Sequence, residues 1–232
     1  MTEDKLVIMV LDPVQTRVLG SLIEKEITTP ENYPLSLNTL VNACNQKSSR
    51  DPVMELSEDE VRRALRTLED DELVSTLHDA RVPKFEHRIR TVLNLRRDET
   101  AVLCLLMLRG PQTAGELRGR SERLHTFDDI AGVQTTLERL AGREAASESA
   151  PGATGPLTVL LPRLPGSREA RYAHLLSGAP EVSIPSTPPV TARTSADAER
   201  IALLEQKIET LSSALEALQA RVEDLETSGN AG

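Results

Sequence analysis

The sequence is nearly free of aromatic residues and contains no tryptophan. Aromatic residues make up 2% of the 232 residues. Without large rings, the core has to be built from leucine, valine, isoleucine and alanine, whereas strands favour aromatic and β-branched side chains. This scarcity favours packed helices over a sheet sandwich, so we expect a mainly α protein with small β-hairpins.

Cysteine and long apolar runs are also scarce. Cys44 and Cys104 are the two cysteines of the chain, and such a distant pair provides neither a metal cluster nor a disulfide framework. We expect both thiols to be buried and reduced. The longest apolar run, residues 101–108, is far shorter than the ~20 residues of a membrane span, and residues 7–11 are too few for a signal peptide core. These absences predict a cytoplasmic protein without a membrane partner.

Motifs for catalysis and cofactor binding are missing as well. The four histidines, His78, His87, His125 and His174, occur singly, whereas a zinc site needs several ligands at defined spacing. The sequence has no glycine-rich phosphate loop and no G-x-S-x-G nucleophile motif. We therefore expect no enzymatic activity, no metal and no cofactor.

Acidic residues outnumber basic ones, by 36 to 27, for a net charge of −9. A chain that coats nucleic acid without specificity needs many cations to neutralise phosphates, so that function is disfavoured. The excess acid is unevenly spread, because residues 179–232 contain nine acidic and four basic side chains. The rest of the chain therefore has room for a local basic surface.

What the sequence does contain is an ordered series of helices and short strands. Apolar periodicity and capping residues predict helices at about 12–26 and 36–45, a third helix that opens at the capping box of Ser57 and Glu60, and β-prone segments at 73–77 and 88–95. Three helices followed by a two-stranded hairpin is the winged helix-turn-helix arrangement.

The same order recurs further along the chain. Helices are expected at about 99–109, 113–120 and 128–140, followed by a hairpin from 157–161 and 170–175. Val133, Leu137 and Leu140 repeat the spacing of Val61, Leu65 and Leu68. A repeat of ~80 residues predicts two tandem winged-helix modules, at 1–96 and 97–178.

A linker and a coiled coil are predicted after the modules. Residues 179–196 are rich in proline and predict a flexible linker. Residues 197–227 predict a parallel coiled coil that makes the chain a homodimer, and residues 228–232 a disordered end. The alternative is a lone amphipathic helix folded back on the modules. The seam of the coil alternates steps of three and four and consists of Ile201, Leu204, Ile208, Leu211, Leu215, Leu218, Val222 and Leu225.

Several strings of residues are long enough to compare with known families. They are TPENYPLS at 29–36, ACNQK at 43–47, RDPVM at 50–54, LRGPQT at 108–113, GELR at 115–118 and EARYAHL at 169–175. In these strings, residues 11–178 resemble the YceH-like family of uncharacterised bacterial proteins. The resemblance implies a pair of winged-helix modules and a bacterial cytoplasm, and it implies no activity.

Candidate DNA contacts lie in the first module. The arginines of its third helix are Arg62, Arg63 and Arg66, the cations of its hairpin are Arg81, Lys84, Arg88 and Arg90, and the polar loop before the third helix has Asn45, Gln46, Lys47 and Arg50. Cations of this kind contact phosphates, and arginine can bind a guanine edge. Carboxylates at both ends of the third helix favour a solvated, salt-bridged surface instead, and the loop residues equally suit a structural role in holding the turn at Arg50.

Two functions fit these features. The first is a dimeric DNA-binding protein of the transcription-regulator or nucleoid-associated type, with duplex DNA as its partner. The alternative is a tandem winged-helix adaptor that binds another protein in a chromosome-organising or other regulatory complex, which the acidic balance and the few cations on the third helix of the second module favour.

Overall fold

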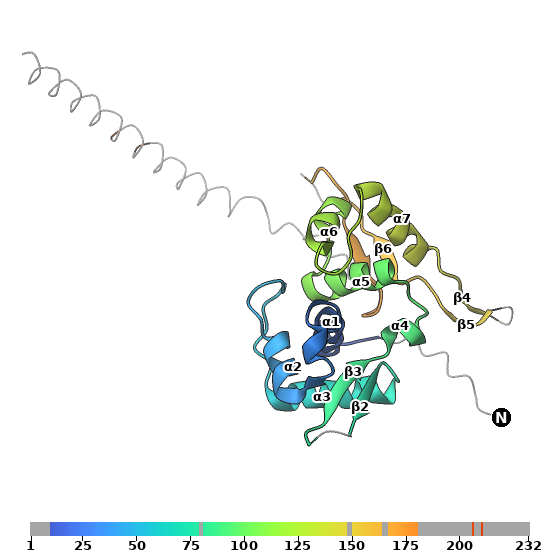
Figure 1. Cartoon of the computed structure of the whole chain (residues 1–232). Helices are drawn as coiled ribbons and strands as arrows, with labels where there is room; N and C mark the ends of the chain where they lie inside the picture. Colours follow the sequence, from blue (N-terminus) through green and yellow to red (C-terminus); the bar gives the residue numbers. More distant parts are fainter. Residues whose placement is uncertain are drawn as a thin grey trace, which may run out of the picture. The chain divides into compact units, whose positions relative to one another are not determined.

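The computed structural model describes residues 10–78, 81–147, 150–163 and 167–180, together with Gln206 and Thr210. The fold is mainly helical with small antiparallel sheets, as the composition predicted (Figure 1). The predicted coiled-coil seam and the disordered end lie outside the described residues, and so does the linker apart from its first two residues.

The first set of elements begins with a helix whose start the sequence specifies closely. Asp12 caps α1, Pro13 occupies the first turn, and the side chain of Gln15 completes a capping box. The set comprises α1 (Pro13–Thr28), the 3₁₀ turn η1 (Pro30–Asn32), β1 (Leu35–Ser36), α2 (Leu37–Cys44), α3 (Glu58–Asp70), β2 (Val74–Leu77), β3 (Lys84–His87) and α4 (Ile89–Val92). Its three strands form one antiparallel sheet in the order β1-β3-β2.

The second set repeats the order of three helices and a hairpin. It comprises α5 (Arg97–Arg109), α6 (Ala114–Ser121), α7 (Ile130–Ala141), β4 (Ala145–Ser147), β5 (Ala150–Thr154), β6 (Thr158–Leu160) and β7 (Tyr172–His174). β6 pairs with β7, and an isolated antiparallel bridge joins Gln112, just before α6, to Tyr172 in β7. Thr113 caps α6 and Asp129 caps α7. The predicted helices and hairpin of this half are confirmed to within about two residues at each end.

The predicted strand at 88–95 is wrong, because residues 89–92 form the helix α4. The second strand of the hairpin is β3, where Phe85 pairs with Thr76. Ile89 and Leu93 are both buried, and a spacing of four places both side chains on one face of a helical turn rather than of a strand. Threonine and valine in this segment suggested a strand, but the burial pattern is helical.

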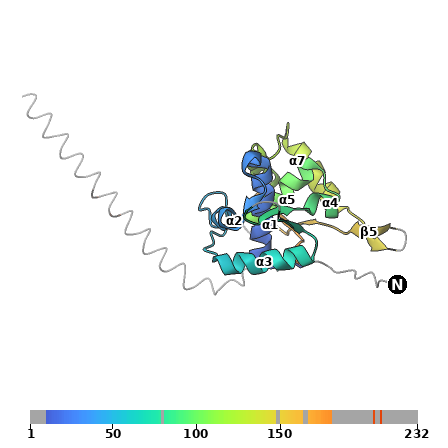
Figure 2. The same cartoon turned by 60° about the horizontal axis from the view of Figure 1, so that its bottom comes forward.

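The hairpin of β4 and β5 is a further element that the sequence did not predict. These strands pair antiparallel with a register shift between residues 145 and 147. The hairpin projects past the helices (Figure 2). Its strands contain alanine, serine, proline and glycine, which have low β propensity, so no alternating pattern marked it.

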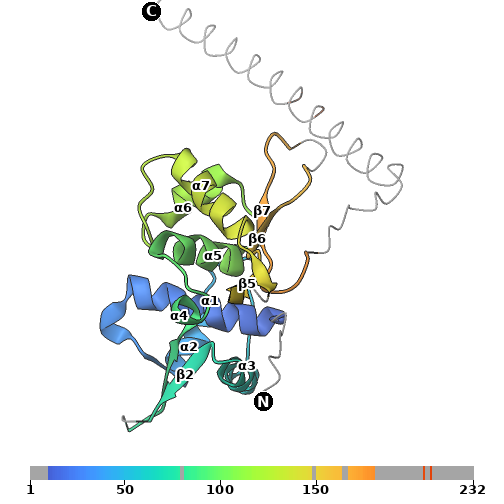
Figure 3. The same cartoon turned by 90° about the vertical axis from the view of Figure 1, so that its right-hand side faces the viewer.

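The two sets meet where α1 packs on α5 (Figures 1 and 3). At Gly20 the helices approach closely enough that an added Cβ atom would lie 2.9 Å from Cδ2 of Leu108. The Cys104 thiol donates to the carbonyl oxygen of Gly20 over 3.4 Å, and the backbone N–H of Asp51 donates to the carbonyl of Leu108 over 2.9 Å. Apolar side chains of both sets form one continuous core.

The end of the second set also returns to the start of the first. The N–H of Leu11 donates to the carbonyl of Leu176 over 2.7 Å, and the hydroxyls of Thr16 and Ser177 lie 3.0 Å apart. The described residues between 10 and 180 belong to one compact unit. The boundary predicted at residue 96 therefore separates two sets of elements inside this unit.

Both cysteines are buried and free, as predicted. Burial raises the pKa of the Cys44 thiol to about 11 and raises that of Cys104 further. A thiol with a raised pKa is protonated near neutral pH and reacts poorly. Both side chains therefore act as small core residues.

Candidate nucleic-acid interface

The helix α3 is the element predicted to contact DNA. Ser57 caps it, and the carboxylate of Glu60 accepts the N–H of Ser57 over 2.8 Å. The Ser57 hydroxyl also donates to this carboxylate, over 2.6 Å, and the two hydrogen bonds lower the pKa of Glu60. Val61 and Leu65 are buried on its inner side. The opposite side of α3 therefore faces solvent along its whole length.

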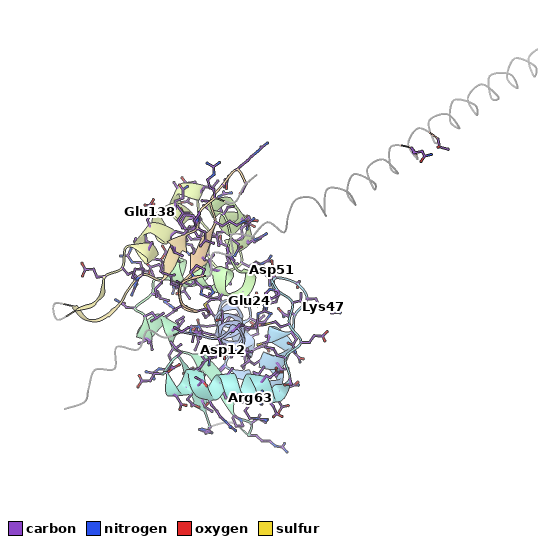
Figure 4. The ribbon with its side chains drawn as sticks, turned by 180° about the vertical axis from the view of Figure 1, so that it is seen from behind. Asp12, Glu24, Lys47, Asp51, Arg63 and Glu138 are labelled. Carbon is purple, nitrogen blue, oxygen red and sulfur yellow. The ribbon has the colours of Figure 1, made fainter. Side chains whose placement is uncertain are left out.

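The three arginines of α3 share the outer side but differ in their partners. Arg62 forms ion pairs with Glu58 and Asp59, one turn earlier on the same helix. Arg63 and Arg66 are exposed and form no ion pair with any residue that the structure describes. Figure 4 shows Arg63 on α3. Two of the three predicted cations are therefore available to an anion, and the third is neutralised within its own helix.

Acidic side chains remain at the C-terminal end of α3. Glu69 and Asp70 are exposed, and the carboxylate of Glu69 accepts the N–H of Thr76 on β2 over 3.2 Å. This contact ties the helix to the hairpin. The positive part of the exposed surface is therefore limited to the middle of α3.

The cations of the hairpin occupy two places. Arg81 lies in the tip after β2, and Lys84 begins β3 and is half-buried. Arg88 and Arg90 are exposed beyond the end of β3, at and within α4. The structure therefore brings Arg81 and Lys84 to the outer half of the hairpin, and it places the other two at its base.

A buried polar contact fixes the base of the hairpin to α1. Nε2 of His87 lies 2.8 Å from Oε2 of Glu26, and the N–H of His87 donates to the Tyr33 hydroxyl over 2.6 Å. The hydrogen bond with His87 lowers the pKa of Glu26 despite its partial burial, and burial raises the pKa of Tyr33. Sequence patterns indicated no partner for His87, because the contact joins residues 61 positions apart.

The loop candidates are mostly structural. The side-chain amide of Asn45 donates to the carbonyl of Leu56 over 2.8 Å, and its oxygen accepts the N–H of Leu56 over 2.7 Å. The Arg50 side chain is 0% exposed and forms two hydrogen bonds with Glu24, of 3.1 and 2.6 Å. Gln46 is half-buried, and Lys47 is exposed. Asn45 and Arg50 thus hold the loop in place and are not available for DNA, which agrees with the structural alternative.

The third helix of the second set has a different outer side. Gln134, Thr135 and Glu138 are exposed on α7, and Arg139 forms ion pairs with Asp98 and Glu99 of α5. Burial raises the pKa of Asp98, but hydrogen bonds from Thr136 and the charge of Arg139 outweigh it and lower the pKa overall. Figure 4 shows Glu138 on α7, at the end of the compact unit opposite to Arg63. The exposed side of α7 therefore presents no unpaired cation.

Metal ligation and membrane insertion find no support in the described residues. No group of three or more histidine, cysteine, aspartate or glutamate side chains in that part of the chain could hold a metal ion. Within the same residues, no helix combines the length and the apolar character that crossing a bilayer requires.

Several known bacterial proteins resemble this chain over most of its length. The family described as "Protein of unknown function, DUF480" matches residues 11–167. A UPF0502 protein of Koribacter versatilis is 50% identical over 204 residues, which cover 88% of this chain and 91% of that protein. UPF0502 proteins of Solibacter usitatus and Aeromonas hydrophila are 47% and 44% identical over 214 and 225 residues, covering 92% and 94% of this chain and 98% and 99% of those proteins.

Proposed function

This chain belongs to the DUF480 family, and from this premise we propose that it binds duplex DNA through the first of two tandem winged helices. The proposal assigns the DNA contact to α3 and to the hairpin of β2 and β3. It treats the protein as a transcription regulator or nucleoid-associated factor of the bacterial cytoplasm without catalytic activity.

The topology of the first set is the observation that supports this proposal most. A winged helix places a short strand between its first and second helices and pairs it with the hairpin that follows the third. Here β1 follows α1 directly before α2, and Leu35 and Ser36 pair with Phe85 and Lys84 of β3. The third helix of such a module enters the major groove, and α3 holds this position.

The second set follows the same topology with a shorter strand. The bridge between Gln112 and Tyr172 occupies the place of β1, since Gln112 precedes α6 and Tyr172 belongs to the second strand of the hairpin. Two successive sets that share this order support a tandem pair, although in the second set the hairpin of β4 and β5 is inserted between α7 and β6. They share one core, so we propose two winged helices joined back to back.

The surface of the first set fits a weak, salt-dependent contact. Arg63 and Arg66 lie three residues apart on the outer side of α3, and Arg81 and Lys84 lie on the hairpin that packs beside it. Each cation that neutralises a phosphate releases counterions, so affinity falls as salt rises. The carboxylates of Glu69 and Asp70 repel phosphates and weaken the affinity for DNA. A second copy of the chain would offset this loss by raising the effective concentration of the binding site.

We therefore propose a homodimer in which the seam residues 201–225 pair in parallel. Residues 179–196 would then connect each DNA-binding unit to the coiled coil without setting the distance between the two units, because a flexible linker fixes no distance. Such a dimer tolerates variable spacing between half-sites. Equilibrium sedimentation of the full chain, compared with a variant in which Leu211 and Leu218 are both changed to Lys, tests the pairing.

The DNA contact is tested with fluorescence anisotropy of the full chain on a labelled duplex of about 30 base pairs. We expect the double variant Arg63→Gln/Arg66→Gln to raise the Kd about tenfold at low salt and to reduce the salt slope by roughly 1 to 2. The matched control is Arg118→Gln, because Arg118 is an exposed arginine of α6 in the second set. The control should bind as the unaltered chain does.

Two results would contradict the proposal. Binding that is unchanged in the double variant removes α3 from the interface. Equal weakening in the Arg118→Gln control shows that net charge alone sets the affinity.

The second set favours a different partner class, which is the alternative function. Ile130 on α7 and Leu160 on β6 are exposed by 47% and 52%, and α7 has no unpaired cation in the described residues. An outer side with exposed apolar residues and little positive charge suits another protein better than a phosphate backbone. Capture of a protein partner that survives nuclease treatment and is lost in an Ile130→Asp variant would favour the adaptor.

A further inference from the structure

A polar pocket lies at the junction of the two sets, away from α3. Its volume is about 280 Å³, near the lower end of the ~300–1,000 Å³ of pockets for small ligands. One wall consists of the end of α1 and the loop of residues 46–49, and the other of the ends of α5 and α6. A ligand bound there would contact both sets at once. Figure 4 shows Glu24 and Asp51 at this level of the molecule, between Arg63 and Glu138.

The lining is strongly basic although the chain as a whole is acidic. It contains the four cations Lys25, Arg109, Arg120 and Arg123 and a single carboxylate, that of Glu24. This carboxylate is already engaged, because both of its oxygens accept hydrogen bonds from buried Arg50. Lys25 lies 3.7 Å from the same carboxylate, and Arg120 lies 3.7 Å from that of Glu116. Arg109 and Arg123 are therefore the lining cations that form no ion pair with the residues that the structure describes.

The arginines of the lining come close enough to repel one another. Burial lowers the pKa of Arg109, and the charges of Arg120 and Arg50 lower it further. A lowered pKa at a guanidinium means that its positive charge is destabilised by its surroundings. An anion in the pocket would relieve this repulsion, and none of the described neighbours does so fully.

Hydrogen-bond donors remain available in the same place. Arg123 is exposed and forms no hydrogen bond or ion pair with the residues that the structure describes. Arg109 donates one N–H to Oγ of Ser49 over 2.9 Å and has further donors. The hydroxyl of Ser48 also lines the pocket. Guanidinium forks and hydroxyls together are the donors that a phosphate group prefers.

From these observations we propose that the pocket binds the phosphate group of a small phosphorylated molecule. Arg109 and Arg123 from the second set hold the phosphate oxygens, and the loop with Ser48 and Ser49 from the first set closes on the other side. A phosphate occupies only part of the volume, which leaves space for a small organic group. By contacting both sets, the ligand stabilises their junction and makes the protein responsive to a metabolite.

Isothermal titration calorimetry of the full chain with inorganic phosphate tests the site, with sodium chloride at equal ionic strength as the reference. We expect a phosphate-specific binding signal. The Arg123→Gln variant should bind phosphate about tenfold more weakly, as expected for the loss of one charge-assisted contact, and Arg109→Gln/Arg123→Gln more weakly still. Arg123 has no structural partner among the described residues, so its single variant keeps the test valid if the double variant fails to fold.

The matched control is Arg118→Gln, which removes the same charge from α6 without touching the pocket. It should leave the Kd for phosphate unchanged. No phosphate-specific signal, an unchanged Kd in Arg123→Gln, or an equal loss in Arg118→Gln would each overturn the proposal. If a duplex displaces phosphate from the pocket, the phosphate groups of DNA are its ligand and the assignment to a small molecule is wrong.

Discussion

The third helices of the two sets share a buried pattern and differ at every exposed position that matters for binding. Val133, Leu137 and Leu140 of α7 are buried with the spacing of Val61, Leu65 and Leu68 of α3. With this alignment, Arg62, Arg63 and Arg66 correspond to Gln134, Thr135 and Glu138, and Thr67 corresponds to Arg139. The same inner face therefore supports a basic patch in the middle of the outer face in one set and a nearly neutral outer face in the other.

The comparison shows that topology constrains the inside of a helix and leaves its outside free. Arg139 is exposed by only 33% because it folds back to Asp98 and Glu99, whereas Arg63 has no such neighbour among the described residues. In the first set the buried arginine that pairs with a carboxylate is Arg50, which comes from a loop rather than from the third helix. Each set thus has an internal ion pair, but at a different position and depth.

The largest expected effect tests this difference in depth. Replacing Arg50 by Ala leaves the buried carbonyl of Ala43 without its arginine donors and the carboxylate of Glu24 with only Lys25, at 3.7 Å, so we expect a loss of about 3 kcal/mol of unfolding free energy. Arg139→Ala is the matched change in the second set, and its partly exposed pairs predict about 1 kcal/mol. Urea unfolding followed by circular dichroism measures both losses of stability. Equal losses would contradict the conclusion that the Arg50 ion pair is more deeply buried than those of Arg139.

A larger side chain at Gly20, where α1 packs on α5, tests whether the two sets unfold together. In Gly20→Val the added methyl groups would press on Leu108, because a Cβ atom at position 20 would already lie 2.9 Å from Cδ2 of that side chain. We expect a loss of about 2 kcal/mol and a single transition that moves as a whole. Gly20→Ala is the smaller step of the same series and should cost less, since its single methyl meets Cδ2 and Cγ of Leu108 at 2.9 and 3.1 Å and adds no further methyl groups. Two separate transitions, only one of them shifted, would mean that the sets fold independently.

A half-buried histidine gives the second set a pH dependence of its own. Burial lowers the pKa of His174 from 6.5 to about 4, and its Nδ1 atom is buried without a hydrogen-bond partner among the described residues. Between these two pH values the unfolded chain binds the proton and the folded chain does not, so stability falls as pH falls from 6.5 towards 4. We expect a loss of about 1 to 2 kcal/mol between about pH 7 and pH 5.

The His174→Gln variant should remove most of that slope, and His78→Gln, which changes an exposed histidine, should keep it. Urea unfolding at each pH supplies the free energies. A slope that persists in His174→Gln would assign the pH dependence to other groups.

The smallest effect compares the caps of the two second helices. Thr113 accepts the N–H of Glu116, and the Glu116 carboxylate accepts the N–H of Thr113 in return, which makes a reciprocal capping box. Ser36 accepts the backbone N–H of Thr39 over 3.4 Å, and its hydroxyl lies 2.9 Å from that of Thr39, but no carboxylate of the described residues returns a hydrogen bond to the N–H of Ser36. We expect Thr113→Ala to cost about 1 kcal/mol and Ser36→Ala about half of that. Thermal unfolding of both variants checks the order, and a larger effect at Ser36 would reverse it.

Local patterns in the sequence predicted most of the helices, because the features that define them lie within a few residues. Ser57 caps α3 through the predicted capping box, and Asp12 and Thr113 cap helices that begin one residue after the predicted starts. The repeat of three helices and a hairpin was visible for the same reason. The mainly helical fold and the buried cysteines are likewise confirmed.

Contacts between distant residues were beyond what the sequence could predict. The sequence suggested that Arg50 could hold its turn, but nothing near Arg50 indicates that its partner is Glu24 on α1. His87 and Glu26 form a second pair of this kind. Similarly, the segment after His87 was predicted to be a strand from its residue types. Only its packing reveals that Ile89 and Leu93 share one face of a helical turn. The family is shown by similarity, and it adds no site residue to those that the structure places.

The close packing of α1 on α5 has a consequence for how partners reach the protein. Because these helices form the centre, α3 and α7 lie on opposite sides of the compact unit (Figures 1 and 3). A straight rod that touches one of them runs away from the other, so a single chain cannot clasp one duplex between its two third helices. A partner that binds at α3 leaves α7 accessible on the opposite side. This arrangement suits a protein that contacts two partners at once better than one that encloses a single partner.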